Sequence, residues 1–381
     1  MHICIAGPVS LNLLNHPFDR EKIPPGYPYP PMAQFVNAFL KRGHKVSVVS
    51  YSTGISKPVV LESENISLYI AKRREKHAAR DFFKEEVKQM IDFFNSINCD
   101  IIISNWTYEI SLAAIKSKQK KVTIRMHDYP PLIFRFNHSP YQFIRTLIHY
   151  MVTRKAKYLN ANSDYLFSLL SKKIRAKTIV IPNFLSNEIF EKPKIPKGNY
   201  IITVSNGFSG HKNIYKGILA FAELRKKAND LEYYLVGSGF GENEEAYRFA
   251  KEKNVMNGIT FLGSIPYDET LKLISGAKIM LHPSLEESFG MSVLEAMALG
   301  TPVVGGAKSG NIPYLLGFGE YGIICDVTNH YDMANKLYQL LNDNEKMDYF
   351  SKRAIKYSFE NYSENVVLSK FENYLGDILN D

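Results

Sequence analysis

The sequence lacks the features of several classes of protein. Its three cysteines, Cys4, Cys99 and Cys325, are far apart and odd in number, so they provide neither a disulfide framework nor the spacing of a metal site. It has no run of about 18 apolar residues, so we expect no membrane-spanning helix. The apolar segment after His2 is too short, and too poor in preceding basic residues, for a signal peptide. These absences predict a chain that folds in a reducing cytoplasm.

Charge is distributed unevenly along the 381 residues. Residues 1–195 hold 29 Lys+Arg against 15 Asp+Glu, whereas residues 196–381 hold 18 against 23, for a total of +9. Hydrophobic residues make up 45% of the chain, enough for two cores, and halves of opposite charge indicate two domains with different partners. A basic half suits nucleic acid, a membrane surface or an anionic substrate. Because no nucleic-acid-binding module is recognisable, we predict no nucleic-acid partner.

Both halves alternate apolar, β-rich segments with helical patterns. This alternation predicts α/β domains with doubly wound parallel sheets, which bind ligands at the carboxyl ends of their strands. A linker rich in proline and charge is expected at 182–198. Helices are expected at 81–95, 141–157 and 363–379. The expected strands are 2–7, 45–50, 67–71, 100–104, 122–127 and 178–182 in the first half, and 200–205, 232–236, 259–262, 278–282, 302–304 and 322–325 in the second.

The segment 281–304 carries the most chemical information. From residue 281 it reads Leu-His-Pro-Ser-Leu-Glu-Glu-Ser-Phe-Gly-Met-Ser-Val-Leu-Glu, and a helix from about Gly290 is expected to stop at Gly300. The start of that helix presents free N–H groups that suit a phosphate. Glu287 in the loop and Glu295 in the helix are suited to accept hydrogen bonds from sugar and ribose hydroxyls. Two glutamates at this spacing, without the framing residues, would more often be solvated carboxylates.

With its framing residues, the segment resembles the Glu-x7-Glu signature of the retaining glycosyltransferases of family 4. The resemblance implies the GT-B architecture, in which two Rossmann-like domains face a central cleft. It implies an acceptor-binding domain at residues 1–190 and a nucleotide-sugar donor domain at 198–360. The final helix, within 361–381, has no strand after it, and we expect it to pack back on the first domain.

The resemblance also assigns residues of the donor domain. The lysine that contacts the donor diphosphate in the family matches Lys212, which is followed by Asn213, while Lys216 is a competing candidate. An ammonium there neutralises charge on the departing nucleotide. The arginine that commonly precedes this lysine is absent, and Asn206 with the glycine backbone is the expected replacement. Glu287 and Lys212 are also assigned as catalytic. The predicted donor-binding residues are Asn206, Gly207, Lys212, Leu262, Gly263, Ser264, Ile265, Glu287, Ser288, Phe289, Gly290, Met291, Ser292 and Glu295.

Four positions in the first half are predicted near the donor sugar or the acceptor. His127 and Asp128 resemble a His-Asp of the family, so His127 is included among the catalytic residues, without the role of general base; a structural role at the strand end is the alternative. Trp106, the only tryptophan, is suited to stack on an acceptor sugar or to belong to the core. Gly26 lies in the Pro- and Tyr-rich segment 24–31, which fits either an acceptor wall or a plain surface loop.

Two segments of the first half concentrate positive charge. Residues 72–80 read Lys-Arg-Arg-Glu-Lys-His-Ala-Ala-Arg, and the helix expected at 141–157 combines apolar positions with four basic ones. Basic residues near a membrane gain about 1 kcal/mol each from anionic lipid. We therefore hypothesise peripheral contact with the inner face of the cell membrane and a lipid-linked acceptor. A solvated basic face is the alternative.

The residues and the resemblance together predict a cytoplasmic retaining glycosyltransferase. It would move a hexose-type sugar from a nucleotide diphosphate sugar to a glycan or lipid-linked glycan in surface-polysaccharide assembly, with the nucleobase left open. No Asp-x-Asp sequence is present, so we expect metal independence and no cofactor besides the donor substrate. The alternatives are a GT-B nucleotide-sugar epimerase, a phosphorylase, and a non-catalytic nucleotide-binding assembly protein.

Overall fold

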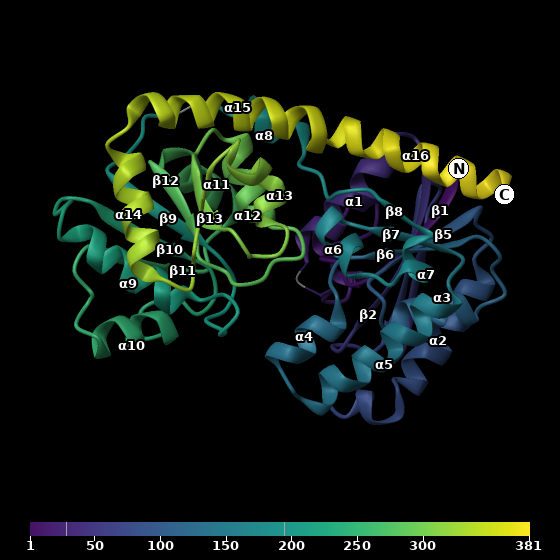
Figure 1. The fold of residues 1–381 in the computed structure, drawn as a ribbon. Helices are drawn as coiled ribbons and strands as arrows, with labels where there is room; N and C mark the ends of the chain where they lie inside the picture. Colours follow the sequence, from purple (N-terminus) through teal and green to yellow (C-terminus); the bar gives the residue numbers. More distant parts are fainter. Residues whose placement is uncertain (28, 194) are drawn as a thin grey trace. The chain divides into compact units, whose positions relative to one another are not determined.

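The chain forms two compact units. The computed structural model describes residues 1–27, 29–193 and 195–381. Unit 1 contains Met1–Asn162, Leu166–Pro182 and Leu368–Asp381, and unit 2 contains Ser163–Tyr165 and Asn183–Val367. Pro28, in the predicted Pro- and Tyr-rich segment, and Lys194, in the predicted linker, lie outside the described residues. Figure 1 shows the elements of both units.

An eight-stranded sheet forms the centre of unit 1, in the order β3-β4-β2-β1-β5-β6-β7-β8. The central strand β1 is buried from Ile3 to Ala6 and pairs in parallel with β2 on one side and β5 on the other. The strands that follow β1 in the chain are therefore added first on one side of β1 and then, from β5 onward, on the other. Such a switch point leaves a crevice at the carboxyl ends of the neighbouring strands. The strands are β1 (His2–Ala6), β2 (Lys45–Ser52), β3 (Val59–Glu62), β4 (Ile66–Lys72), β5 (Ile101–Asn105), β6 (Val122–Met126), β7 (Tyr158–Ala161) and β8 (Thr178–Val180).

Two of these strands, β3 and β7, were not predicted from the sequence. β3 alternates between half-buried and exposed residues, and β7 contains the polar Asn160, so neither is a buried strand that is apolar throughout. β3 pairs antiparallel with β4 at the edge of the sheet, so the expectation of purely parallel pairing is wrong at this edge. The other neighbouring strands of the sheet are parallel, and the α/β class with doubly wound parallel sheets is confirmed.

Helices cover both faces of this sheet (Figure 1). On one face, Val87, Met90 and Phe94 of α2 share a core with Ile102 and Ile124 of the strands, because they recur at a spacing of three or four residues. The helices of unit 1 are α1 (Pro30–Lys41), α2 (Lys84–Ser96), α3 (Glu109–Lys116), α4 (Pro130–Phe136), α5 (Pro140–Lys155), α7 (Lys172–Arg175) and most of α6 (Asp164–Leu169), with short 3-10 turns at Leu11–Leu13, Arg20–Lys22 and Ala78–Asp81.

Unit 2 is built on a six-stranded sheet in the order β11-β10-β9-β12-β13-β14, and its strand pairs are parallel. Here the switch point lies between β9 and β12. The strands are β9 (Tyr200–Val204), β10 (Glu232–Val236), β11 (Ile259–Gly263), β12 (Ile279–His282), β13 (Val303–Gly306) and β14 (Ile323–Cys325).

Two apolar clusters fill unit 2. One joins α9 and α14 to the strands, and the other joins α12 to β12, β13 and α15. The helices are α8 (Asn187–Glu191), α9 (Ile214–Arg225), α10 (Glu245–Glu252), α11 (Tyr267–Gly276), α12 (Met291–Ala298), α13 (Ile312–Leu315), α14 (His330–Leu341) and α15 (Asn344–Tyr362), with a 3-10 turn at Gly317–Gly319. Among the described residues, no helix combines the length and the apolar character that crossing a membrane requires.

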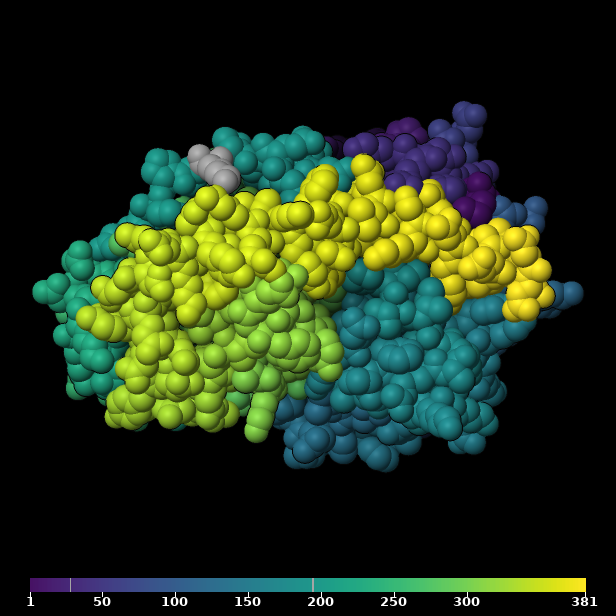
Figure 2. Space-filling model, turned by 45° about the horizontal axis from the view of Figure 1, so that its top comes forward, coloured from purple at the N-terminus to yellow at the C-terminus, as the bar shows by residue number. Residues whose placement is uncertain are grey.

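The last helix, α16 (Glu364–Asn380), contributes its final turns to unit 1. Its apolar positions Leu368, Phe371, Leu375 and Ile378 are buried and recur every three or four residues. Polar contacts reinforce this packing, since Lys121 donates to the carbonyl of Ile378 at 2.8 Å, and Arg42 and His44 both contact Glu372. In Figure 2 the yellow end of the chain lies over the purple and blue surface of unit 1.

Replacement of Phe371 tests how much the packing of α16 stabilises unit 1. Its ring lies 5.2 Å from that of Phe35 and 6.3 Å from that of Phe39, and it is fully buried. We expect Phe371→Ala to lower the free energy of unfolding of unit 1 by about 3–5 kcal/mol, because it removes contacts and leaves a cavity. Urea unfolding measures this. The control, Phe143→Ala, removes a ring that is 48% exposed and should stay within about 0.5 kcal/mol; equal losses would contradict the prediction.

Candidate active site

The loop between β12 and α12 forms the centre of the site. Gly290 occupies the residue before α12 with φ +98°, a left-handed conformation that favours glycine, and a Cβ there would lie 2.7 Å from Ile312. Helix α12 then starts at Met291, as predicted, and no side chain caps its first turn. The first N–H groups of a helix lack partners within it and carry partial positive charge. The loop therefore ends at a group of N–H donors of the kind that suits an anion.

Glu287 is held in this loop by three groups that converge on one oxygen. Its Oε1 accepts a hydrogen bond from Lys212 Nζ at 2.6 Å and another from Ser284 Oγ at 3.0 Å. His282 Nε2 lies 3.3 Å from the same oxygen. The Lys212 and Glu287 side chains are only 20% and 15% exposed, so the ion pair is largely shielded from solvent. The structure thus brings together the two predicted catalytic residues of the second half.

The Glu287 carboxyl stays ionised at any ordinary pH. Burial alone would raise its pKa, but the charge of Lys212 and the contact with His282 outweigh burial and hold the pKa well below the usual range. An ionised carboxylate only accepts hydrogen bonds. Since the described contacts meet at Oε1, Oε2 is the oxygen suited to a hydroxyl of a ligand.

Asn213 fixes the backbone that carries Lys212. Its Nδ2 donates to the carbonyl of Pro283 at 2.9 Å and to that of Val327 at 2.8 Å, and the residue is buried. Its φ of +56° is in the left-handed region, which explains why asparagine or glycine suits this position. A backbone bond from Leu285 to the carbonyl of His211, at 2.7 Å, joins the same two loops. Lys212 is therefore directed at Glu287 by its neighbours.

A third loop, after β13, is hydrogen-bonded to the Glu287 loop. Ser309 Oγ donates to the carbonyl of Ser284 at 2.5 Å, and Asn311 donates through its backbone to Glu287 and through its side chain to Phe289. Ser309 and Asn311 are both buried. Because the Phe289 ring is buried as well, the predicted contact of this residue with a donor is restricted to its backbone.

Glu295 lies inside α12 and is paired with a tyrosine. It accepts a hydrogen bond from the Tyr267 hydroxyl at 2.9 Å, and only 7% of the residue is exposed. Burial raises the pKa of Glu295 to about 7, although the hydrogen bond from Tyr267 acts in the opposite direction. The carboxyl is therefore half ionised near neutral pH, which makes this predicted ribose-binding group dependent on pH.

Of the other predicted donor-binding residues, Asn206 and Gly207 follow β9, residues 262–265 lie at the carboxyl end of β11, and Ser288, Met291 and Ser292 lie in the β12–α12 loop and the first turn of α12. Gly207 donates to the carbonyl of Ser238 at 2.9 Å, and Gly237 donates to that of Gly263 at 2.8 Å, so the loops are tied together. The Asn206 side chain accepts from the backbone of Ser238 at 3.5 Å. These loops surround the same edge of the sheet as Lys212. Among the described residues, Leu262, Ile265 and Met291 pack against the apolar cluster around α12, and the Ser288 carbonyl accepts a hydrogen bond from Ser163 Oγ at 2.6 Å.

In unit 1, His127 and Trp106 form a stacked pair. The ring centroids are 4.3 Å apart, and His127 Nε2 lies 2.9 Å from Asn105 Oδ1. Burial, followed by the charge of Arg125, holds the pKa of His127 well below its usual range, so the ring is neutral. Trp106 has φ +60°, a strained conformation for a tryptophan. Such strain is common where a side chain is held for a ligand.

Asp128 and Gly26, the remaining predicted acceptor residues, contact other parts of unit 1. Asp128 Oδ2 accepts a hydrogen bond from Tyr108 at 2.7 Å. Burial raises the pKa of Asp128 against the effects of Arg145 and Tyr108. A Cβ on Gly26 would lie 2.4 Å from the carbonyl of Val9, so the close approach that this glycine permits is to the chain itself.

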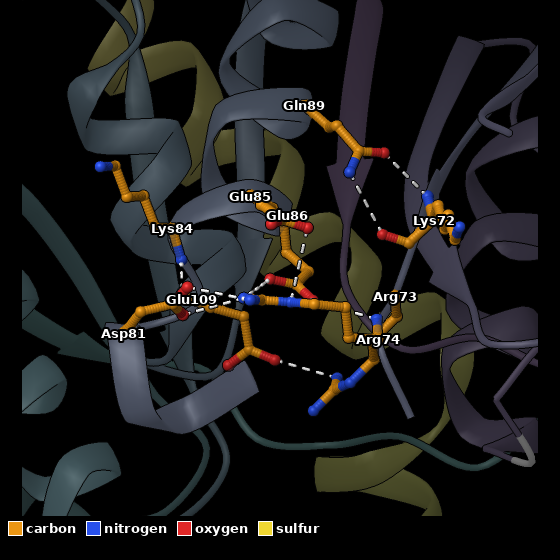
Figure 3. Close-up of polar contacts among 9 residues, drawn as sticks. All are labelled: Lys72, Arg73, Arg74, Asp81, Lys84, Glu85, Glu86, Gln89 and Glu109. Carbon is orange, nitrogen blue, oxygen red and sulfur yellow. Dashed lines mark hydrogen bonds and ion pairs between the residues drawn. The ribbon is translucent and has the colours of Figure 1, made fainter. Parts of the chain in front are cut away.

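Some side chains of the basic segment 72–80 form ion pairs within unit 1 (Figure 3). Arg74 bonds to Asp81 at 2.8 Å and to the buried Glu86 at 2.7 Å. Arg73 bonds to Glu109 at 3.0 Å, and its guanidinium lies 4.1 Å from the Tyr51 ring centre. The charges of these two side chains are therefore balanced by carboxylates of unit 1, and the predicted membrane contact of the basic segments stays a hypothesis.

Sequence models of two protein families match the chain. The family described as "Glycosyl transferases group 1" matches residues 186–357, and the family described as "Glycosyltransferase Family 4" matches residues 32–188. Together they extend from residue 32 to residue 357.

Individual relatives are more distant. The N-acetyl-alpha-D-glucosaminyl L-malate synthase of Bacillus anthracis is 26% identical over 65% of this chain and 63% of its own length. A D-inositol 3-phosphate glycosyltransferase of Corynebacterium aurimucosum is 30% identical over 45% of this chain and 42% of its own. The chain thus spans less than two thirds of these curated relatives.

Solved structures share the fold over the whole chain. Sucrose-phosphate synthase of Thermosynechococcus elongatus has a TM-score of 0.78 at 16% identity and covers 100% of both chains. HepE of Anabaena, in complex with UDP-glucose, has a TM-score of 0.72 at 15% identity and covers 99% of this chain and 100% of its own.

Several residues of the site were not predicted from the sequence. His282 and Ser284 stand inside the motif, next to Glu287 in sequence, so their proximity was available as a signal. Asn213 was noted only as a companion of Lys212. Tyr267 and the Ser309–Asn311 loop are brought to the site by folding alone, and no local pattern indicated them.

Asn213 is predicted to position Lys212 through its side chain and its backbone conformation. We expect Asn213→Ala to lower the free energy of unfolding by about 2–4 kcal/mol, since two buried carbonyls lose their donor and alanine is strained at positive φ. Asn213→Gly should recover about 1 kcal/mol, because it removes only the strain. Denaturant unfolding of both variants measures this. Equal stabilities of the two variants would show that the left-handed conformation is unimportant.

The raised pKa of Glu295 predicts that the free energy of unfolding depends on pH. Its pKa is about 7 in the folded chain and about 4.3 when unfolded, so the folded state binds the proton more tightly. Its contribution to stability is therefore full below about pH 4 and is lost as the pH rises through 7. Relative to Glu295→Gln, the unchanged protein should lose about 2–3 kcal/mol between pH 5 and pH 8. Urea unfolding at both pH values measures this, and parallel pH profiles would contradict it.

Proposed function

Because the chain belongs to glycosyltransferase family 4 and has the GT-B fold, we propose that it is a retaining hexosyltransferase. It transfers a hexose-type sugar from a nucleotide diphosphate sugar to a hydroxyl of a glycan or lipid-linked glycan, in surface-polysaccharide assembly. The observation that carries the proposal is the shielded Lys212–Glu287 pair beside the start of α12. It combines a cation for a diphosphate with a carboxylate for a sugar.

The diphosphate of the donor binds between Lys212 and the start of α12. The ammonium has three donors and gives one to Glu287, which leaves two for phosphate oxygens. The N–H groups of the first turn of α12 supply further donors, and Gly290 keeps side-chain atoms away from them. These groups meet the negative charge that develops on the departing nucleotide.

Glu287 and Glu295 hold hydroxyls at the two ends of the donor. Glu287 accepts from the transferred sugar through Oε2, while Lys212 and Ser284 fix its carboxylate. Glu295 accepts from the ribose when it is ionised. During transfer, the bond from the anomeric carbon to the diphosphate oxygen breaks and a bond to the acceptor oxygen forms on the same face. The proton of the acceptor hydroxyl passes to the departing phosphate oxygen, so a protein base is unnecessary.

The names of related proteins support this class of reaction. HepE is solved with UDP-glucose, and a trehalose-6-phosphate protein of E. coli with UDP-2-fluoro glucose. Among the sequence relatives, the names include transfer to L-malate and to D-inositol 3-phosphate. A uridine diphosphate hexose is accordingly the first donor to try.

The acceptor end of the reaction is proposed to take place at the cytoplasmic face of a membrane. Helices α4 and α5 expose Phe136, Phe143 and Tyr150 together with Arg154 and Lys155. Aromatic side chains of this kind insert at the boundary of headgroups, and the basic residues attract anionic lipid. The Arg73 and Arg74 charges, by contrast, are balanced by Glu109 and Glu86 within unit 1.

Donor binding and turnover test the proposed function together. A nucleotide diphosphate or its sugar at 100 times its dissociation constant should raise the free energy of unfolding by about 2.7 kcal/mol, which thermal-shift measurements detect. Lys212→Ala should lower kcat by about 100-fold or more, because it removes the cation opposite the departing nucleotide. Turnover should persist in EDTA, since Lys212 and the helix supply the positive charge.

Lys216→Ala is the matched control. This lysine lies one turn beyond Lys212 and is partly exposed, and its variant should keep normal turnover. The proposal fails if no nucleotide changes the melting temperature or if EDTA abolishes turnover. Donor binding without any transfer would indicate a non-catalytic binding protein, and release of free nucleotide without an acceptor would indicate an epimerase.

A further inference from the structure

A short segment from the first half of the chain belongs to unit 2. It contains Ser163–Tyr165, which follow β7 and open α6, and the residues before and after it, Asn162 and Leu166, belong to unit 1. Ser163 is buried, with only 4% of the residue exposed. The segment bonds to residues that lie 121 and 125 positions later in the chain.

Ser163 and Tyr165 are bonded to the residues on either side of Glu287. Ser163 Oγ donates to the carbonyl of Ser288 at 2.6 Å. The Tyr165 hydroxyl donates to Glu286 Oε2 at 2.9 Å. The segment therefore contacts the Glu287 loop both before and after the carboxylate that is proposed to hold the transferred sugar.

The bond from Ser163 completes a row of fixed carbonyl groups. Asn311 donates through its backbone to the carbonyl of Glu287 at 2.8 Å and through its side chain to that of Phe289 at 2.9 Å. Ser163 supplies the bond to the carbonyl between them, that of Ser288. With three successive carbonyls held, the backbone that directs the Glu287 side chain and leads into α12 has a defined course. A shielded carbonyl that loses its donor is unfavourable, so removal of the Ser163 hydroxyl would loosen this backbone.

The residue before Ser163 is anchored at the other predicted catalytic position. Asn162 is buried, and its backbone N–H donates to the carbonyl of Met126 at 3.2 Å. Its side-chain Nδ2 donates to the carbonyl of His127 at 3.4 Å. Consecutive Cα atoms are held about 3.8 Å apart by a trans peptide bond, so Asn162 cannot move without Ser163. One peptide bond thus joins the anchor at His127 to the anchor at Ser288.

We propose that Ser163 and Tyr165 are positioning residues for Glu287. Through the peptide bond to Asn162, they couple the backbone at His127 to the Glu287 loop. The proposal rests on the proposed function, in which Glu287 holds the transferred sugar, and it adds a regulation of that site. A ligand that displaces the His127 backbone changes the position of the Glu287 carboxylate, and so changes turnover more than the affinity for the nucleotide.

Hydrogen exchange of the full chain tests the positioning without any ligand. The Leu285 amide donates to the carbonyl of His211, and the Asn311 amide donates to that of Glu287. Exchange of these amides reports the opening of the loop. We expect Ser163→Ala to speed the exchange of peptides that contain them about tenfold, the effect of one lost hydrogen bond, while peptides from β9 keep their rate. Mass spectrometry measures both sets of peptides.

Ser358→Ala is the matched control. Ser358 is buried in α15 of the same unit and donates to the carbonyl of Ile355 at 3.0 Å, so the variant loses a similar bond elsewhere. It should leave the exchange of the two loop peptides unchanged. Ser163→Thr keeps the hydroxyl and should restore the original rate. If that variant does not fold, Tyr165→Phe, which loses only the bond to Glu286, carries the test and should speed the exchange about threefold.

A double-mutant cycle tests the coupling. Asn162→Ala removes the side-chain bond to His127 and should speed the exchange of the same peptides about threefold. When Ser163→Ala is already present, the second substitution should change the rate by less than about twofold, because its effect passes through Ser163. Additive effects would show that the two anchors act independently and would overturn the coupling.

Turnover of UDP-glucose with water as the acceptor tests the consequence for the reaction. The bond from the anomeric carbon to the UDP oxygen breaks, a bond to the water oxygen forms, and a proton of the water passes to UDP. We expect Ser163→Ala to lower kcat about tenfold and to keep KM within about twofold, because Lys212 and the start of α12 still hold the diphosphate while Glu287 is misplaced. Ser358→Ala should keep both values.

Each outcome decides the proposal. Unchanged exchange in Ser163→Ala, or equal acceleration throughout unit 2, overturns it, and so does a loss of turnover that appears in KM instead of kcat. If the unchanged protein does not turn over UDP-glucose and no nucleotide raises its melting temperature, the proposed function fails, and the exchange measurements alone decide this inference. Local acceleration that Ser163→Thr reverses, together with a lowered kcat, supports both.

Discussion

The candidate active site depends on one shielded ion pair, between Lys212 and Glu287. The Glu287 carboxylate would be unfavourable in this place alone, because burial disfavours an isolated charge, and the nearby Lys212 ammonium lowers the pKa of Glu287 and keeps it ionised. The pair also sets a constraint on the backbone, since the two residues come from loops 75 positions apart in sequence. The fold has to bring those loops within hydrogen-bond distance before the site exists.

In unit 2, hydrogen bonds between uncharged groups hold these two loops together. Asn213 ties the Lys212 loop to the end of β12, while Ser309 and Asn311 fix the Glu287 loop from the opposite side. The left-handed residues Asn213 and Gly290 make the two sharp turns that this arrangement needs. The charged groups are therefore positioned by a rigid uncharged frame, which is how preorganised electrostatic sites avoid rearrangement during reaction.

Much of the fold and part of the candidate site could be predicted from the sequence, and the physical reasons differ between the two. Buried parallel strands are apolar throughout, so most of both sheets could be predicted, whereas β3 is half exposed at the edge of its sheet and β7 contains the polar Asn160. The segment with Glu287, Gly290 and Glu295 was identifiable because its parts are adjacent in the chain. Tyr267, Ser309 and Ser163 were not, because only folding brings them to their sites. The pairing of Arg73 and Arg74 was equally hidden, since charge counts record the basic side chains but not their partners.

The final turns of α16 have a consequence for how the protein is made. Phe35 and Phe39 precede unit 2 in the chain, yet their core includes Phe371, which follows it. Proteins are synthesised from the N-terminus and their domains generally fold in that order. Here unit 1 keeps an open apolar face until unit 2 has been synthesised, because the core residues of α16 follow unit 2 in the chain. Folding of unit 1 is thereby coupled to the synthesis of α16, and a chain without α16 would expose the surface that this helix covers.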